Sequence, residues 1–99
     1  MALVPMGDLL RKAKEGGYAV GYFESWDIES LKAVVNAAEE SRSPVIIGFN
    51  GGMLTDSRRI LKPENLEYYA AIGLIAARNA TVPVALILNE VQDFELAVK

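Results

Sequence analysis

Apolar residues recur every three or four positions between residues 28 and 41, and this spacing predicts a helix with one buried face. The positions on that face are Ile28, Leu31, Val34, Val35 and Ala38. Asp27 directly precedes the stretch and is suited to cap its first turn. Pro44 follows it and disfavours helical backbone at the residue before it.

Three other stretches, residues 18–23, 45–49 and 84–88, are short and continuously apolar. Runs of this kind are typical of strands in a parallel sheet that is covered on both faces. Helices are expected before the first run, over residues 6–15, and between the second and third, over residues 63–78. Gly73 lowers the stability of the latter helix and therefore indicates a close approach to the sheet.

Strands and helices thus alternate along the chain, which predicts an α/β fold with a parallel sheet. We expect a single domain over residues 1–99, with about three βα units preceded by an N-terminal helix. The third unit would be cut short, because Asp93 is suited to cap a helix that stops at Lys99.

The composition restricts the chemistry more than it restricts the fold. The chain has no Cys and no His, which removes thiol nucleophiles, imidazole acid–base groups and Cys/His metal sites. Its net charge of −3 and scattered basic residues argue against a nucleic-acid partner. No apolar run is long enough to span a membrane and no signal peptide is visible, so we expect a cytoplasmic protein without a membrane partner.

Polar side chains follow each of the three apolar runs. They are Glu24, Asn50, Asn89 and Glu90. Because the carboxyl ends of parallel strands meet at one edge of a sheet, these side chains are expected to share one patch. Two carboxylates and two amides are suited to bind a divalent cation or sugar hydroxyls, and one of two close carboxylates can serve as a general acid or base. The alternative is that they are ordinary polar strand ends.

The second run continues into Asn50, Gly51 and Gly52, whose unhindered N–H groups could hold a phosphate beside Arg58 and Arg59. The alternative is a flexible loop with solvated arginines. The aromatic residues Trp26, Tyr68 and Tyr69 are expected to be core or helix-cap contacts and not sugar-stacking surfaces.

Three segments together resemble the N-terminal part of the class II, zinc-dependent fructose-bisphosphate and tagatose-bisphosphate aldolases. They are residues 10–21, with Gly-Tyr-Ala-Val-Gly at 17–21, residues 37–47, and residues 82–90, Val-Pro-Val-Ala-Leu-Ile-Leu-Asn-Glu. The resemblance implies part of a (β/α)8 TIM barrel, a fold that takes ~250 residues. It also implies either a fragment of a longer protein, favoured by the interrupted helix at Lys99, or a homo-oligomer that covers the exposed sheet.

The resemblance also implies a site that has changed. In the family the residue corresponding to Asn89 is the catalytic Asp, the one corresponding to Glu90 is a zinc-ligating His, and Ile87 replaces an earlier His. Asn cannot transfer a proton at neutral pH, although Glu90 could bind a metal through oxygen. Zinc is therefore expected to be absent from this chain.

The functional prediction is an aldolase-like protein of sugar-phosphate metabolism, an aldehyde-lyase family, that is inactive as this chain because of Asn89 and Glu90. Glu24 is the further candidate for catalysis, and Asn50, Gly51 and Gly52 are candidates for substrate binding. The alternatives are a non-catalytic sugar-phosphate-binding protein and a self-assembling partial barrel.

Overall fold

The structure, a computed structural model, describes residues 3–51 and 65–89. Its helices and strands alternate, and in chain order they are α1 (Met6–Gly16), β1 (Tyr22–Ser25), α2 (Ile28–Ser41), β2 (Val45–Asn50), α4 (Asn65–Asn79) and β3 (Val84–Asn89). The predicted α/β organisation of three βα units after an N-terminal helix is confirmed, except that the predicted helix after Asp93 lies outside the described residues.

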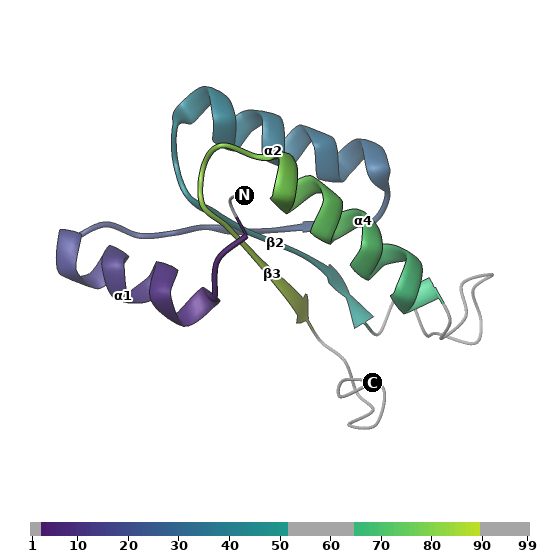
Figure 1. Ribbon diagram of the computed structural model, residues 1–99, viewed down its shortest axis with the longest axis horizontal. Coiled ribbons are helices and arrows are strands. Elements are labelled where there is room, and N and C mark those ends of the chain that lie inside the picture. Colours follow the sequence, from purple (N-terminus) through teal and green to yellow (C-terminus); the bar gives the residue numbers. More distant parts are fainter. Residues whose placement is uncertain (1–2, 52–64, 90–99) are drawn as a thin grey trace.

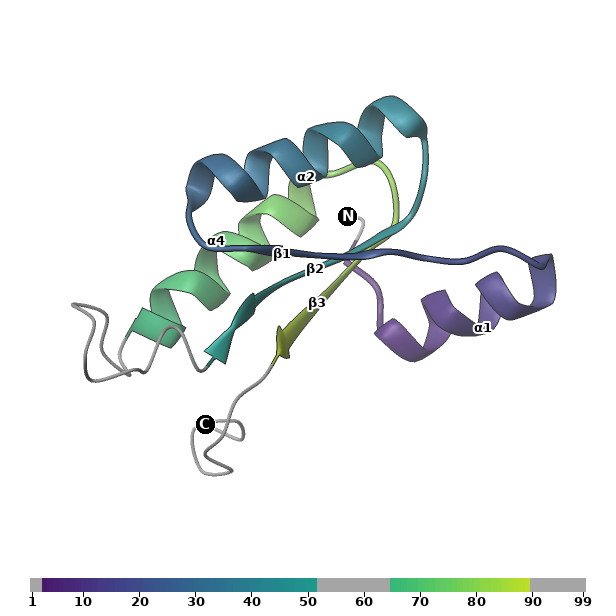
Figure 2. The same cartoon turned by 180° about the vertical axis from the view of Figure 1, so that it is seen from behind.

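The three strands form one parallel sheet in the order β1-β2-β3. Helices α2 and α4 lie side by side over one face of the sheet, whereas α1 lies on the other side, near the amino ends of the strands (Figures 1 and 2). Among the described helices, none has both the length and the apolar character needed to cross a membrane.

The main core lies between the sheet and the helix pair. Ile47 of β2 and Val84 of β3 are completely buried there, and Leu31 of α2 packs into the same cluster. A ring–ring contact extends this core toward the carboxyl ends of the strands, because Phe49 and Tyr69 meet edge to face with centroids 4.7 Å apart.

A smaller cluster covers the opposite face of the sheet. Leu9 of α1 packs against Ile46 of β2 and Ala85 of β3. The chain before α1 also joins the sheet, because the Val4 N–H donates a hydrogen bond of 2.9 Å to the Val84 carbonyl. These contacts fix α1 to the sheet.

The first strand is later and shorter than the apolar run at residues 18–23 predicted. Its ladder begins at Tyr22, opposite Ile46, and continues to Ser25. The partner strand begins only at Val45, and Pro44 before it has no N–H to donate. Apolar character therefore continues for several residues before a partner strand is available.

Both ends of α2 are capped as local chemistry requires. Asp27 Oδ1 accepts a 2.7 Å hydrogen bond from the Ser30 N–H, and Ser30 Oγ accepts one of 3.1 Å from the Asp27 N–H. The hydrogen bonds from Ser30 lower the pKa of Asp27. At the other end Arg42 takes a left-handed conformation, with φ 50°, and ends the helix before Pro44.

The close approach predicted at Gly73 is confirmed. A Cβ at this position would lie 2.8 Å from Leu86 Cδ1 of β3. Asn79 is the last residue of α4 and has an ordinary negative φ, and its Nδ2 donates a 2.8 Å hydrogen bond to the Ile75 carbonyl. The side chain satisfies a terminal carbonyl, so the backbone need not reverse.

Glu39 of α2 holds the turn between α4 and β3. Its Oε1 accepts hydrogen bonds from the N–H groups of Thr81, at 2.6 Å, and Val82, at 3.0 Å, and its Oε2 accepts one from the Thr81 hydroxyl. The hydrogen bond from the Thr81 side chain, followed by those from the two backbone groups, lowers the pKa of Glu39.

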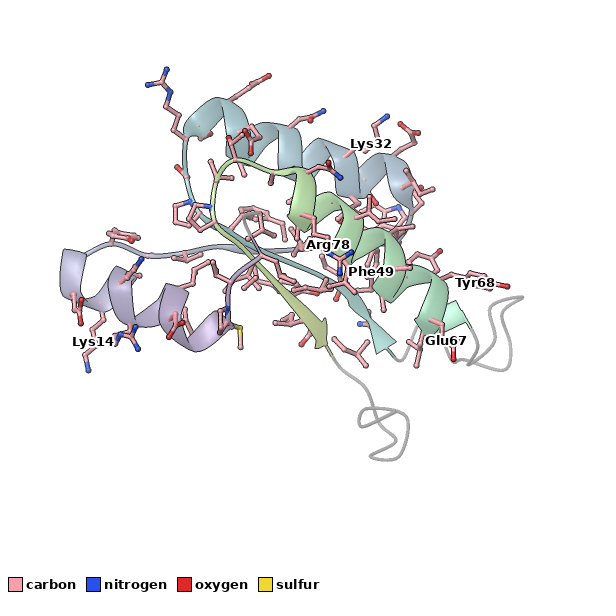
Figure 3. All side chains as sticks on the ribbon, in the orientation of Figure 1. Lys14, Lys32, Phe49, Glu67, Tyr68 and Arg78 are labelled. Atoms are coloured by element: carbon pink, nitrogen blue, oxygen red, sulfur yellow. The ribbon has the colours of Figure 1, made fainter. Side chains whose placement is uncertain are left out.

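The aromatic predictions are confirmed for one residue of three. Tyr69 packs against the core and its hydroxyl donates to the Trp26 carbonyl at 3.1 Å. Trp26 and Tyr68, predicted to be core or cap contacts, are 58% and 68% exposed. Tyr68 points away from α4 at the start of that helix (Figure 3).

Replacing Glu39 by Gln is expected to destabilise the chain in a pH-dependent way. Because folding lowers the pKa of Glu39, its stabilisation is complete above the ordinary pKa of a glutamate and is lost as the pH falls through the lowered pKa of the folded state. Urea denaturation of wild type and Glu39→Gln should therefore differ most at neutral pH and converge in acid. Glu40→Gln, an exposed neighbour on α2, is the control, and an equal effect of both variants would contradict the assignment.

Replacing Gly73 by Leu is expected to lower the free energy of unfolding by about 1–3 kcal/mol, because the added side chain overpacks Leu86. Gly73→Ala should change it little, since the gain of ~1 kcal/mol in helix propensity opposes a contact with a movable side chain. Ala71→Leu, at an exposed position of α4, should be tolerated. Chemical denaturation that ranked Ala71→Leu and Gly73→Leu alike would show that there is no close approach.

Candidate functional site

The candidate site lies on the face of the sheet that carries Ile46 and Ala85, here called the inner face. Side chains of a strand alternate between the two faces, so the strand register decides which polar residues share it. The register aligns Tyr22 with Ile46, and Asn50 with Asn89. The inner face therefore carries Tyr22 and Glu24 from β1, Gly48 and Asn50 from β2, and Ile87 and Asn89 from β3.

Glu24 is the centre of this group. Its Oε1 accepts a hydrogen bond of 3.1 Å from the Tyr22 hydroxyl and a long one of 3.4 Å from Asn89 Nδ2. All three side chains are half-buried. Residues at the two edges of the sheet, 65 positions apart in sequence, thus contact each other across the middle strand.

Gly48 is the residue of the middle strand that lies next to Glu24. It stands opposite Glu24 on one side and Ile87 on the other. A Cβ on Gly48 would lie 2.2 Å from the Ile87 carbonyl oxygen and 3.0 Å from Ile87 Cγ1, so the strand cannot carry a larger residue without moving its neighbour. Gly48 therefore adds no side chain to the inner face between Glu24 of β1 and Ile87 of β3.

The carboxyl end of β2 adds the remaining described candidates. Asn50 is half-buried and aligned with Asn89, and Gly51 follows it in a buried position. Both residues make polar interactions within the structure. An amide and a backbone N–H at this edge are suited to a polar ligand, and neither carries a charge that would repel an anion.

The structure therefore brings three predicted site residues, Glu24, Asn50 and Asn89, to one part of one face, and places Gly51 next to them. Glu24 lies within β1 and not in a loop after it, so the predicted strand end at Phe23 is wrong. The predicted candidates Gly52 and Glu90 lie outside the described residues, as do Arg58 and Arg59.

Tyr22 is the participant that the sequence analysis missed. Its position inside an apolar run indicated a buried strand residue, and its hydroxyl carried no separate signal. The spacing of two between Tyr22 and Glu24 does place both on one face of a strand, so the alternation rule could have found it. The neighbour Ser25 faces the other way, is 2% exposed, and its Oγ has no hydrogen-bond partner among the described residues.

The zinc site of the resemblance does not fit the described residues. Within residues 3–51 and 65–89 no group of three or more His, Cys, Asp or Glu side chains is arranged to hold a metal ion. The whole chain lacks His and Cys. The inner face offers one carboxylate, Glu24, with amides and a phenol around it.

Comparison with known proteins places this chain in a family. Residues 4–99 match the family model described as fructose-bisphosphate aldolase class-II. The chain is 37% identical over its whole length to the probable fructose-bisphosphate aldolase of Bacillus subtilis (strain 168), of which it covers 33%. It is 38% identical to the fructose-bisphosphate aldolase of Geobacillus stearothermophilus over 96% of this chain and 32% of that protein.

A solved structure that resembles this chain is also an aldolase, like the relatives found by sequence. The crystal structure of the YdjI aldolase from Escherichia coli K12 superposes with a TM-score of 0.76 and 29% identity, over 95% of this chain and 33% of that one. The chain thus spans about a third of the length of the relatives it matches, consistent with a partial barrel. It belongs to the class II fructose-bisphosphate aldolase family.

Proposed function

We propose that the inner-face patch binds a sugar phosphate as part of an aldolase-like protein, and that these 99 residues alone do not cleave it. The observation that carries the proposal is the convergence of Glu24, Asn50 and Asn89 on one face at the carboxyl ends of three parallel strands. Ligands of parallel α/β folds bind at this edge. Family membership supplies the class of ligand.

The lack of turnover follows from the groups available for proton transfer. The resemblance assigns proton transfer to the position of Asn89, and an amide neither gives nor takes a proton at neutral pH. Residues 3–51 and 65–89 include no group of three or more His, Cys, Asp or Glu side chains that could hold a metal ion. What remains is hydrogen bonding to a polyhydroxylated, anionic ligand.

Calorimetric titration of the chain with fructose bisphosphate is expected to show binding without cleavage in a coupled aldolase assay. Asn89→Ala should weaken binding about three- to tenfold, the usual effect of losing one uncharged hydrogen bond. Asn36→Ala, at an exposed position of α2, is the matched control. Carbon–carbon cleavage by the chain alone, or equal affinities of the two variants, would contradict this assignment.

A second candidate function, self-assembly, is favoured by the apolar surface around β1. This strand is at the edge of the described sheet, and Phe23 on it is 56% exposed. Beside it a cavity of about 460 Å³ opens between the starts of α2 and α4, lined by Asp27, Ile28, Glu29, Tyr68, Tyr69 and Ile72. An exposed strand edge flanked by apolar side chains is a usual site of pairing between chains.

Light scattering is expected to show a homo-oligomer that Phe23→Lys shifts toward the monomer, because a charge on the edge strand disfavours strand pairing. Leu10→Lys, on α1 at the far end of the sheet and 43% exposed, is the control. A folded wild-type monomer at high protein concentration would rule out self-assembly and leave the binding proposal unaffected.

A further inference from the structure

The two oxygens of the Glu24 carboxylate have different surroundings. Oε1 accepts from Tyr22 and from Asn89, so one donor comes from its own strand and the other from the far edge of the sheet. Oε2 makes no hydrogen bond to the described residues. Two donors on one oxygen restrict the carboxylate plane and leave the second oxygen as the acceptor available to a ligand.

The charge on Glu24 decides which part of a ligand belongs there. No Lys or Arg among residues 3–51 and 65–89 forms an ion pair with this carboxylate. A phosphate is repelled from such a position, whereas a hydroxyl is a good donor to an ionised acceptor. The phosphate of a bound ligand therefore lies away from Glu24, and a hydroxyl lies toward it.

The amide at position 89 fits this arrangement. An amide nitrogen donates to Glu24 Oε1, whereas a carboxylate at the same position would put a second negative charge at that contact and favour protonation of one of the two. The Asp of the family would therefore add a second carboxylate beside Glu24, which the amide of Asn89 avoids. Compared with the family, the carboxylate of this site is on β1, at Glu24, and not on β3. The amide of Asn89 occupies the position of the family's Asp.

We propose that Glu24 is the residue by which this site selects a ligand hydroxyl. Its Oε2 accepts a hydrogen bond from one hydroxyl of the sugar phosphate, and Tyr22 and Asn89 are positioning residues that hold Oε1. Gly48 keeps the space over the middle strand open for the pair. The inference rests on the proposed function, because that function supplies the ligand class.

The first experiment compares fructose bisphosphate with its monodeoxy analogues by calorimetry. Wild type is expected to bind one analogue about ten- to a hundredfold more weakly than fructose bisphosphate, because a hydrogen bond to a charged acceptor is lost. Glu24→Gln should lose a similar factor for fructose bisphosphate and should no longer discriminate against that analogue. Glu15→Gln, an exposed glutamate of α1, should retain both affinities.

The second experiment needs no ligand. Asn89→Asp should lower the midpoint of urea unfolding at neutral pH, because it places two carboxylates in contact, and the loss should disappear in acid. The double variant Glu24→Gln/Asn89→Asp should recover the neutral-pH midpoint. Circular dichroism establishes that each variant is folded. A neutral-pH loss in Asn89→Asp that persisted in the double variant would overturn the pairing.

The outcomes of these experiments distinguish failure of the proposed role of Glu24 from failure of the proposed function. Failure of wild type to bind fructose bisphosphate overturns the proposed function and the hydroxyl contact with it. Binding that is as strong in Glu24→Gln, with the same discrimination among analogues, overturns the role of Glu24 alone. For the positioning residues, Tyr22→Phe should reduce discrimination among the analogues in part, whereas a purely structural role of the phenol would weaken the binding of all of them equally.

Discussion

The hydrogen-bond ladder of β2 is the interaction on which the rest of the structure depends. This middle strand pairs in parallel with β1 over four residues and with β3 over six, and it is buried along nearly its whole length. Parallel pairing brings the carboxyl ends of all three strands to one edge. The register of that ladder then decides which side chains face the helices and which share the inner face.

Alternate side chains of β2 lie on opposite faces of the sheet, so one set packs in the main core and the other lies beside the candidate site. Ile47 and Phe49 face the helix pair and enter the main core, whereas Gly48 and Asn50 face the other way. Gly48 adds no side chain to the inner face between the outer strands, from which Glu24 and Asn89 contact each other. The middle strand thus contributes to the main core with one face, whereas its other face carries Ile46 in the smaller cluster and Gly48 and Asn50 beside the polar residues.

Long-range polar contacts fix the helix pair to this sheet in the same way. Glu39 is a charged residue near the end of α2, where a solvated carboxylate is the usual expectation. It instead accepts hydrogen bonds from the turn at Thr81 and Val82, which would otherwise leave backbone N–H groups unpaired. The contact joins the end of α2 to the start of β3, and it depends on the tertiary arrangement that places these segments together.

Hydrophobic periods of 2 and 3.6 residues in the sequence determined the order of the elements and the parallel α/β class. The sequence also determined the cap at Asp27, which depends on neighbouring residues, and it indicated the close approach at Gly73 through a glycine inside a helix. Three quoted segments determined the family. The start of β1 and the role of Glu39 were decided by partners distant in sequence. The same holds for the site: the sequence placed Glu24, Asn50 and Asn89 at strand ends, but only the register of three strands decided that Tyr22 and Asn89 share one oxygen of Glu24.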